Sequence, residues 1–224
     1  LGVGEQIEAA IPYVKRRFRA NKYLAYFQSF TNTYGPLEYL REVYDGALGN
    51  PDIVGLVIGT RPDCIPNDVL QLLNQYGRSR HVSLEIGLQS FSMKFQNLNV
   101  GVHLMFGAPG ETKQDAIDAA HRINALGVHG VKIHQLMLLK DTVLAKRYAV
   151  TPWPTLSMEE YNGWAMAFIE NLNPAIHIER THGLASHHLE LIAPEWASRR
   201  FEPLMALMKN MRESKKFQGS ALNH

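Results

Sequence analysis

The chain has 224 residues, of which 46% are hydrophobic and 20% are charged, a size and composition that fit one globular domain, or one domain with an extension. Its 23 basic and 21 acidic residues leave a net charge of +2, which argues against a partner bound mainly by charge. No apolar run reaches the roughly 20 residues of a membrane span, no secretory signal opens the chain, and its single cysteine, Cys64, excludes an internal disulfide; we therefore expect a cytoplasmic protein with no membrane partner.

Helical and strand-like segments alternate along the first two thirds of the chain. Apolar residues spaced every three or four positions predict helices over 4–20, 36–48, 67–76 and 112–126. Short apolar runs predict buried strands over 23–30, 53–58, 82–88, 100–106 and 130–138. Thr112 with Asp115 predicts the start of the fourth helix, and Gly127 its end. Strands that alternate with helices indicate a mostly parallel sheet.

The pattern changes after about Lys140. Ser157 and Glu160 predict a capping box for a helix over 157–172, and alternating apolar residues predict a half-buried strand over 175–180. A basic, methionine-rich helix is expected from about residue 199 to 215. We therefore expect an α/β fold with a main domain over 1–148 and a C-terminal α/β extension over 149–224 that packs on it.

One connection is too short for a parallel crossover. About nine residues, 90–98, separate the strand that ends near Gln89 from the strand that begins near Val100, whereas a crossover needs about a dozen or more. Either the two strands pair antiparallel or residues are missing. We favour missing residues near Phe91, and a first residue of Leu rather than Met also indicates an incomplete chain.

Polar segments follow five of the predicted strands, at the positions where parallel α/β proteins place their chemistry. These segments are 28–33, 60–63, 85–90, 107–112 and 140–142. The first could equally be a self-capped turn, the second a local ion pair between Arg61 and Asp63, and the fourth a plain strand-to-helix turn without the Lys-Ser/Thr of a P-loop. Glu85 stands out because a carboxylate in an apolar strand needs a hydrogen-bond partner or a functional reason.

Histidine and cysteine spacing defines no zinc site. His103 and His134 lie inside predicted strands, where alternation does not fix which face they occupy, so a core role and a site role both stay open. His187 and His188 are adjacent and point to opposite faces. Cys64 has no histidine neighbour in the sequence that would favour a nucleophile.

Four of these segments, in chain order, resemble the radical-SAM superfamily. They are residues 22–34, 54–64, 84–90 and 103–112, and the stretches 130–136 and 218–222 extend the resemblance over nearly the whole chain. The chain is most similar to the uncharacterised YhcC-like subgroup of iron–sulfur oxidoreductases, and its Thr-Arg-Pro-Asp element (60–63) also resembles the catalytic subunit of the Elongator tRNA-modifying complex. The resemblance implies a partial (β/α)6 TIM-like barrel.

The resemblance also implies a cofactor chemistry. In such enzymes a Cys-x3-Cys-x2-Cys loop after the first strand holds a [4Fe–4S] cluster that binds S-adenosylmethionine. An electron, delivered by a donor such as flavodoxin or ferredoxin, cleaves the C5′–S bond, and the resulting 5′-deoxyadenosyl radical abstracts hydrogen from the substrate. The cluster loop, and the helix after the fourth barrel strand, are missing from this sequence. We therefore expect no metal site in the chain as given, no catalytic residue identifiable within it, and no activity from it alone.

Residue by residue, the resemblance assigns S-adenosylmethionine to the strand ends. The methionine amino group would lie at Gln28, Thr31, Asn32 and Thr33, and the ribose hydroxyls at Glu85, Gln89 and Ser90. Adenine would lie against Gly107, Pro109, Gly110 and Glu111, while Arg61 would pair with the cofactor carboxylate. The substrate side would hold Asp63, His103, Lys132 and His134.

Three functions therefore remain in view. The first is a radical-SAM enzyme acting on an unknown substrate, with tRNA as a candidate by analogy. Basic residues near the C-terminus could favour RNA, although such a set is more often a solvated helix face: Arg199, Arg200, Lys209, Arg212, Lys215 and Lys216. The alternatives are a cluster-free binding domain and a cluster-free barrel enzyme that binds a phosphorylated metabolite at residues 107–112.

Overall fold

The computed structural model describes residues 1–28, 30–87, 98–185 and 190–222. The chain forms two compact units, Leu1–Val102 and His103–His224, and strand β4 (Asn99–Phe106) contributes residues to both. From the sequence we predicted a main domain over 1–148 and an extension over 149–224. That division is a statement about domains and not about these two units, and it stays a prediction. The join expected near Phe91 lies outside the described residues.

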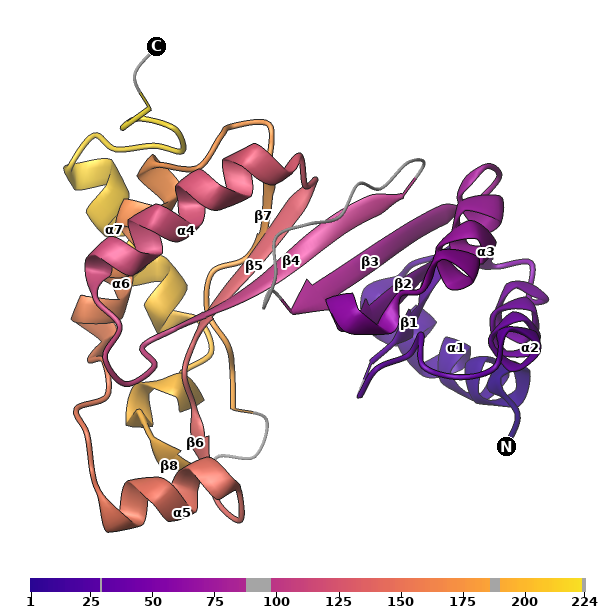
Figure 1. Cartoon of the computed structure of the whole chain (residues 1–224), viewed down its shortest axis with the longest axis horizontal. Helices are drawn as coiled ribbons and strands as arrows, with labels where there is room; N and C mark the ends of the chain where they lie inside the picture. Colours follow the sequence, from indigo (N-terminus) through magenta and orange to yellow (C-terminus); the bar gives the residue numbers. More distant parts are fainter. Residues whose placement is uncertain (29, 88–97, 186–189, 223–224) are drawn as a thin grey trace. The chain divides into compact units, whose positions relative to one another are not determined.

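The main sheet has six strands in the order β1-β2-β3-β4-β5-β7 (Figure 1). Parallel pairing joins β1 to β2, β2 to β3 and β5 to β7, as the alternating pattern predicts. The remaining strands of this sheet are β1 (Tyr23–Phe27), β2 (Ile53–Thr60), β3 (His81–Gly87), β5 (Gly130–Gln135) and β7 (His177–Arg180). A separate antiparallel pair consists of β6 (Leu138–Leu139) and β8 (Leu191–Ala193).

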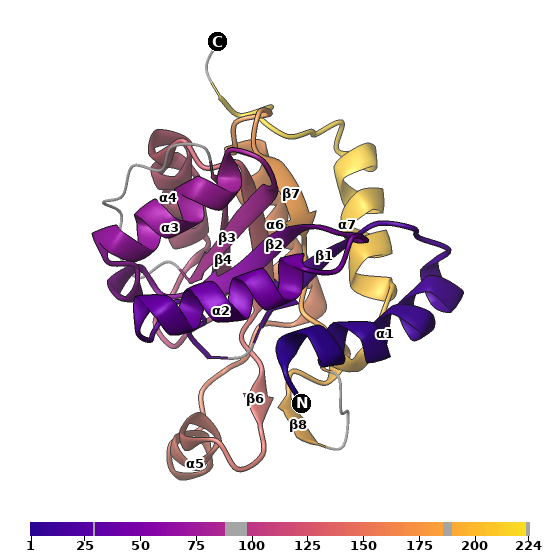
Figure 2. The same ribbon diagram turned by 90° about the vertical axis from the view of Figure 1, so that its right-hand side faces the viewer.

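The first unit packs two helices against one face of β1–β3. Figures 1 and 2 show α2 (Leu37–Leu48) and α3 (Asn67–Gly77) along this face. Apolar side chains fill the layer between helices and strands, and the following are less than 2% exposed: Tyr44, Leu56, Ile58, Leu72, Leu73 and Leu84. The amphipathic helix α1 (Val3–Phe18) has no buried residue, so its packing contributes less to the core.

The second unit packs helices α4 (Lys113–Leu126) and α7 (Glu202–Glu213) against α6 (Met158–Glu170). Phe168 of α6 lies in its core, and its ring centre is 5.5 Å from that of Phe106. Tyr161 is fully buried, and its hydroxyl donates to the carbonyl of Thr181 at 2.6 Å. Burial raises the pKa of Tyr161 well above its ordinary value, so this hydroxyl stays a donor.

A glutamine side chain joins two segments of this second unit. Gln135, at the end of β5, donates from Nε2 to the carbonyl of Gly183 at 2.8 Å and accepts from the Gly183 N–H through Oε1 at 3.0 Å. Gln135 is 1% exposed, and the two bonds satisfy both ends of its amide. The segment that follows β7 is therefore held at the end of β5.

The predicted helices and strands are present, with ends that differ by up to three residues. The strand predicted over 23–30 ends at Phe27, and the last helix begins at Glu202 rather than near residue 199. The sequence pattern missed three short elements: the eight-residue helix α5 (Val143–Val150) and the strands β6 and β8. No helix within the described ranges is long and apolar enough to cross a membrane.

The predicted starts of α4 and α6 are both confirmed. The Asp115 carboxylate accepts from the backbone N–H and the hydroxyl of Thr112, each at 2.7 Å, and Gly127 ends α4 in the left-handed conformation. At α6, Ser157 Oγ accepts from Glu160 N–H at 3.1 Å, and Glu160 Oε2 accepts from Ser157 N–H at 2.8 Å. These bonds satisfy backbone donors that have no partner within the helix.

Ser157→Ala is expected to lower the stability of the protein by about 1 kcal/mol, which is about 2–4 °C in the melting temperature. The backbone N–H of Ser157 and, to a lesser degree, its hydroxyl hold the pKa of Glu160 below its ordinary value of 4.5. The contribution of both bonds is present above that value and is lost as the pH falls through the lower folded-state pKa. Because Ser157→Ala removes only the hydroxyl, thermal unfolding at pH 7 and pH 3 should show a slightly smaller difference between variant and wild type at pH 3.

Ser214→Ala is the matched control. Ser214 lies at the C-terminal end of α7, not at the start of a helix, and its hydroxyl donates to the Asn210 carbonyl. A loss as large for Ser214→Ala as for Ser157→Ala at pH 7 would contradict the capping explanation.

Candidate functional site

The face of β1–β3 opposite the helices carries a buried carboxylate. Glu85 of β3 is 6% exposed, and the hydroxyl of Tyr26 in β1 donates to its Oε2 at 2.5 Å. In the strand register, Tyr26 pairs with Val57, and Glu85 pairs with Gly59. Side chains alternate along a strand, so Glu85 points away from the face that Leu84 and Ile86 share with the helices.

Gly59 of β2 lies between the strands of Tyr26 and Glu85. The two residues lie on strands that both neighbour β2, so about 9–10 Å separates the two strands. The Tyr26 side chain spans this distance to reach Glu85, and Gly59, the register partner of Glu85, has no side chain. A carboxylate and a phenol thus meet near the carboxyl ends of three strands.

The loop after β1 is fastened to the ends of β1 and β2. Asn32 donates from Nδ2 to the carbonyls of Phe27 at 3.2 Å and Gly59 at 3.1 Å, and its N–H also donates to Gly59 at 3.1 Å. Thr33, 1% exposed, bonds through its hydroxyl to Thr60 Oγ1 and to the Cys64 carbonyl. Asn32 and Thr33 therefore position this loop.

Gln28 and Thr31 were also predicted to contact the methionine part of the cofactor, and they lie in surroundings unlike those of Asn32 and Thr33. Gln28 lies just after β1 and lines a cavity of about 510 Å³ together with residues of α1. Thr31 is half-buried. The cofactor roles of both residues, and of Asn32 and Thr33, stay predictions.

Two aromatic residues near the site had no role in the sequence prediction. Tyr26 is one, because its partner Glu85 is 59 positions away and only strand register shows that they meet. Phe30 is the other: it is fully exposed, and its φ of 60° lies in the left-handed region. Bulky residues rarely adopt that conformation, and such strain concentrates at functional sites. No signal in the sequence marks it.

Arg61 and Asp63 form a local ion pair. Arg61 Nη2 lies 2.6 Å from Asp63 Oδ2, and Nε donates to Oδ1 at 3.0 Å. Their side chains are each 60% exposed, and the Arg61 hydrogen bonds hold the pKa of Asp63 below its ordinary value. This is the structural alternative that the sequence left open. Roles for Arg61 towards a cofactor and for Asp63 towards a substrate stay predictions.

The turn after β4 is closed by its own carboxylate. Glu111 Oε2 accepts from the N–H groups of Gly107 and Ala108, both at 2.9 Å. Gly107 and Gly110 have φ of +94° and +89°, which glycine adopts without strain. A phosphate at this turn would have to displace Glu111, which argues against the phosphometabolite alternative. Adenine contacts by Gly107, Pro109, Gly110 and Glu111 stay predictions.

Three residues predicted for the substrate side lie near one another in the second unit. Lys132, 12% exposed, lies 3.4 Å from Glu179 Oε2. Burial lowers the pKa of His134, and the nearby charges of His103 and Arg180 act in the same direction. His134 is therefore neutral at pH 7. Gln89 and Ser90, predicted for the ribose, lie outside the described residues, as do His187 and His188.

The chain is similar in sequence to proteins of two bacteria and to one family model. It is 33% identical over 227 residues to Protein YhcC of Escherichia coli (strain K12), with 91% of this chain and 73% of that protein covered. It is 31% identical over 225 residues to the uncharacterized protein YtqA of Bacillus subtilis (strain 168), with 91% and 70% covered. Residues 128–213 match the family model described as the Radical_SAM C-terminal domain.

The fold is similar to a solved structure of the archaeal Methanocaldococcus infernus Elp3 that has an N-terminal deletion (1–46). The TM-score is 0.76 at 16% identity, over 96% of this chain and 60% of that chain. The chain thus spans less than two thirds of the Elp3 chain. At that identity the likeness concerns the fold alone, and it confirms the predicted fold class, a partial (β/α)6 TIM-like barrel.

Proposed function

Because the chain belongs to the YhcC family of radical-SAM-related proteins, we propose that it is the S-adenosylmethionine-binding part of a radical-SAM enzyme. The observation that carries the proposal is the buried Glu85 carboxylate at the carboxyl end of β3, on the face where Gly59 leaves space. A carboxylate accepts hydrogen bonds from two neighbouring hydroxyls, which is the pattern that a ribose offers. The residues present therefore fit the adenosyl group.

Each residue of the site has a role in this proposal. Glu85 accepts from the ribose hydroxyls, and Tyr26, which donates to Glu85 Oε2, orients the carboxylate. Asn32 holds the β1–α2 loop against the strand ends. When bound, S-adenosylmethionine would supply the 5′-deoxyadenosyl group that abstracts hydrogen from the substrate.

The described residues do not fit the iron–sulfur cluster. Cys64 is the single cysteine of the sequence, and the described part of the chain contains no group of three His, Cys, Asp or Glu side chains able to hold a metal ion. The proposal therefore places the [4Fe–4S] ligands, and docking of a flavodoxin- or ferredoxin-type electron donor, on residues other than these.

The substrate remains open, with tRNA as one candidate. Three of the six basic residues near the C-terminus lie beside acidic partners: Arg199 with Glu202 at 2.9 Å, Lys209 with Glu213 at 3.8 Å and Lys216 with Glu170 at 2.9 Å. Such local pairing reduces the charge available to phosphates.

The proposal predicts that the full-length gene product, reconstituted anaerobically with iron and sulfide, forms 5′-deoxyadenosine from S-adenosylmethionine and dithionite. Mass spectrometry of the nucleoside measures this. A protein that assembles its cluster and binds S-adenosylmethionine but forms no 5′-deoxyadenosine with dithionite or with flavodoxin would contradict it.

The second candidate is a cluster-free binding domain, which a full coding sequence without the upstream cysteines would favour. It predicts that the full-length protein binds S-adenosylmethionine, or another ligand, with no iron incorporated. Iron and sulfide analysis after reconstitution separates the two candidates.

A further inference from the structure

Strand β5 carries two ionisable side chains on one face. Ile133 is fully buried on the other face, so alternation along the strand places its neighbours Lys132 and His134 together. Burial lowers the pKa of His134, and the charges of His103 and Arg180 lower it further. His103 of β4 and Arg180 of β7 therefore lie close to this face of β5.

A shift in strand register brings Arg180 to this face. After Val131, the pairing of β5 with β7 moves by one residue, so that Lys132 pairs with Arg180 rather than with Glu179. Without the extra residue in β7, Arg180 would pair with Ile133, on the buried face of the sheet. Bulges are rare in parallel pairs and are frequent beside active sites, where they re-aim a side chain. Here the shift places Arg180 beside Lys132.

Glu179, the extra residue of β7, is the counter-ion of Lys132. Its Oε2 lies 3.4 Å from Lys132 Nζ. Its carboxylate lies over the backbone of Gly130, where a Cβ atom would clash with Oε1, so glycine leaves the space that the carboxylate fills. The Lys132 side chain is 12% exposed, and a charge that is shielded to this degree needs a partner.

Arg180 has no such counter-ion. It is exposed and forms no salt bridge with another residue that the structure describes. Among the residues of β4, β5 and β7, Glu179 is the one acidic side chain, and it already pairs with Lys132. This face therefore has an excess of positive charge. A guanidinium offers paired N–H donors that match two oxygens of a carboxylate or a phosphate.

We propose that Arg180, with Lys132 beside it, binds an oxyanion group of the substrate, a carboxylate or a phosphate. The inference rests on the proposed function only in calling the bound molecule a substrate. Arg180 holds two oxygens of the group through its paired donors, and Lys132 adds a second positive charge. Glu179 keeps Lys132 in place before the substrate binds, and it competes with the incoming anion for that lysine.

The test is an anion titration of the full-length protein at pH 7 and constant ionic strength, with inorganic phosphate and acetate as the probes. The ring C–H resonance of His134 in a ¹H–¹³C spectrum, assigned by its loss in His134→Gln, reports binding. At least one of the anions is expected to shift it with a Kd on the order of 10 mM, and the anion that binds more tightly identifies the group. The resonance of His121, an exposed residue of α4, should stay in place.

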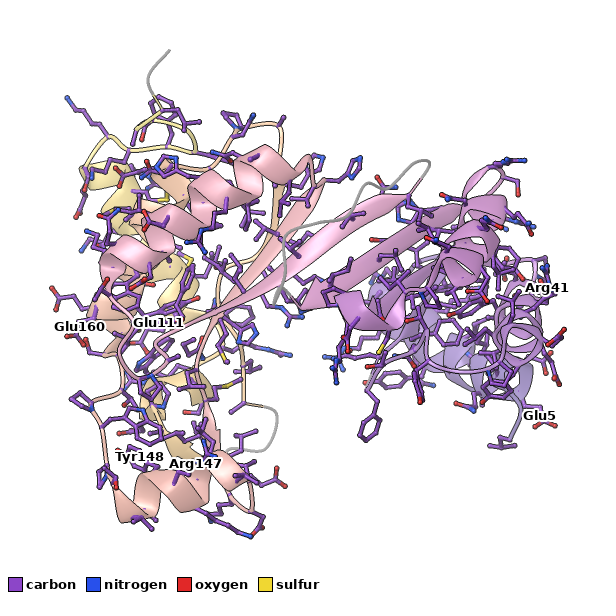
Figure 3. All side chains as sticks on the ribbon, viewed as in Figure 1. Glu5, Arg41, Glu111, Arg147, Tyr148 and Glu160 are labelled. Atoms are coloured by element: carbon purple, nitrogen blue, oxygen red, sulfur yellow. The ribbon has the colours of Figure 1, made fainter. Side chains whose placement is uncertain are left out.

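Two charge changes are expected to act in opposite directions. Arg180→Gln removes the paired donors and should raise the Kd about 5- to 10-fold, whereas Arg147→Gln removes an exposed arginine on α5, apart from β5 and β7 in Figure 3, and should leave it unchanged. Glu179→Gln removes the competing carboxylate and should lower the Kd about 3-fold. Its control, Glu170→Gln, removes a carboxylate that pairs with Lys216 at 2.9 Å and should leave the Kd unchanged.

An unmoved His134 resonance with both anions, equal losses in Arg180→Gln and Arg147→Gln, or weaker binding in Glu179→Gln would overturn the proposal. The titration needs neither the cluster nor S-adenosylmethionine, so a failure to form 5′-deoxyadenosine would contradict the proposed function alone. An unchanged His121 resonance and an unchanged melting temperature show that each variant is folded.

Discussion

Glu85→Ala in the full-length, reconstituted protein is expected to weaken S-adenosylmethionine binding about 10- to 100-fold. The variant removes the acceptor for the ribose hydroxyls, and a hydrogen bond to a charged group contributes about 1.5–3 kcal/mol. Glu85→Gln should lose a large part of the same affinity, because its amide offers a single acceptor oxygen and no charge. Isothermal titration calorimetry with S-adenosylmethionine measures both, without relying on turnover.

Two further variants make this prediction specific. Tyr26→Phe removes the bond that orients Glu85 and is expected to cost less, about 3- to 10-fold in affinity. Glu160→Gln also removes one carboxylate, at the start of α6, and should leave binding unchanged. Wild-type affinity in Glu85→Ala, with the cluster fully assembled, would exclude the ribose role.

Gly55→Ala is expected to destabilise the protein by about 3 kcal/mol, or roughly 6–12 °C in melting temperature. Gly55 lies in β2 and pairs with His81 of β3. A methyl group there would lie 2.1 Å from the His81 carbonyl oxygen and 2.9 Å from its carbon. Those atoms are backbone of the neighbouring strand, so relief requires moving β2 from β3. Thermal and urea unfolding of the chain measure the loss.

Gly46→Ala is the matched control for this change. Gly46 is an exposed residue inside α2, where an added methyl group meets nothing within 4 Å. Because alanine is a better helix former than glycine, this variant should gain about 0.5–1 kcal/mol. If the two variants changed stability in the same direction, the steric explanation for Gly55 would be wrong.

The sequence predicts the elements well where the information is local. Ser157 with Glu160 and Thr112 with Asp115 start their helices through side chains three residues apart, and Gly127 ends one through its own backbone freedom. Helix α5 and the strands β6 and β8 were missed because they are too short for a period to show. The β6–β8 pair also joins segments more than 50 residues apart, which no local pattern reveals.

In the candidate site, too, the sequence predicts the local features and misses those that depend on the fold. Glu85 could be selected from the sequence because a charge in an apolar strand is costly without a partner. The identity of that partner could not be predicted, because Tyr26 reaches Glu85 across β2 only when the three strands pair in the observed register. The Arg61–Asp63 pair was foreseen as a local alternative, whereas the buried bonds of Thr33 depend on how the β1–α2 loop folds back on Thr60.

The hydrogen bonds of Asn32 hold its part of the β1–α2 loop in place in the folded protein without a ligand. Three bonds tie this residue to the carbonyls of Phe27 and Gly59, and the Tyr44 hydroxyl donates to the Asn32 carbonyl at 2.7 Å. The loop therefore loses its conformational entropy when the protein folds, before a ligand arrives. A ligand that binds at these strand ends meets a preorganised surface, and more of its contact energy remains as affinity.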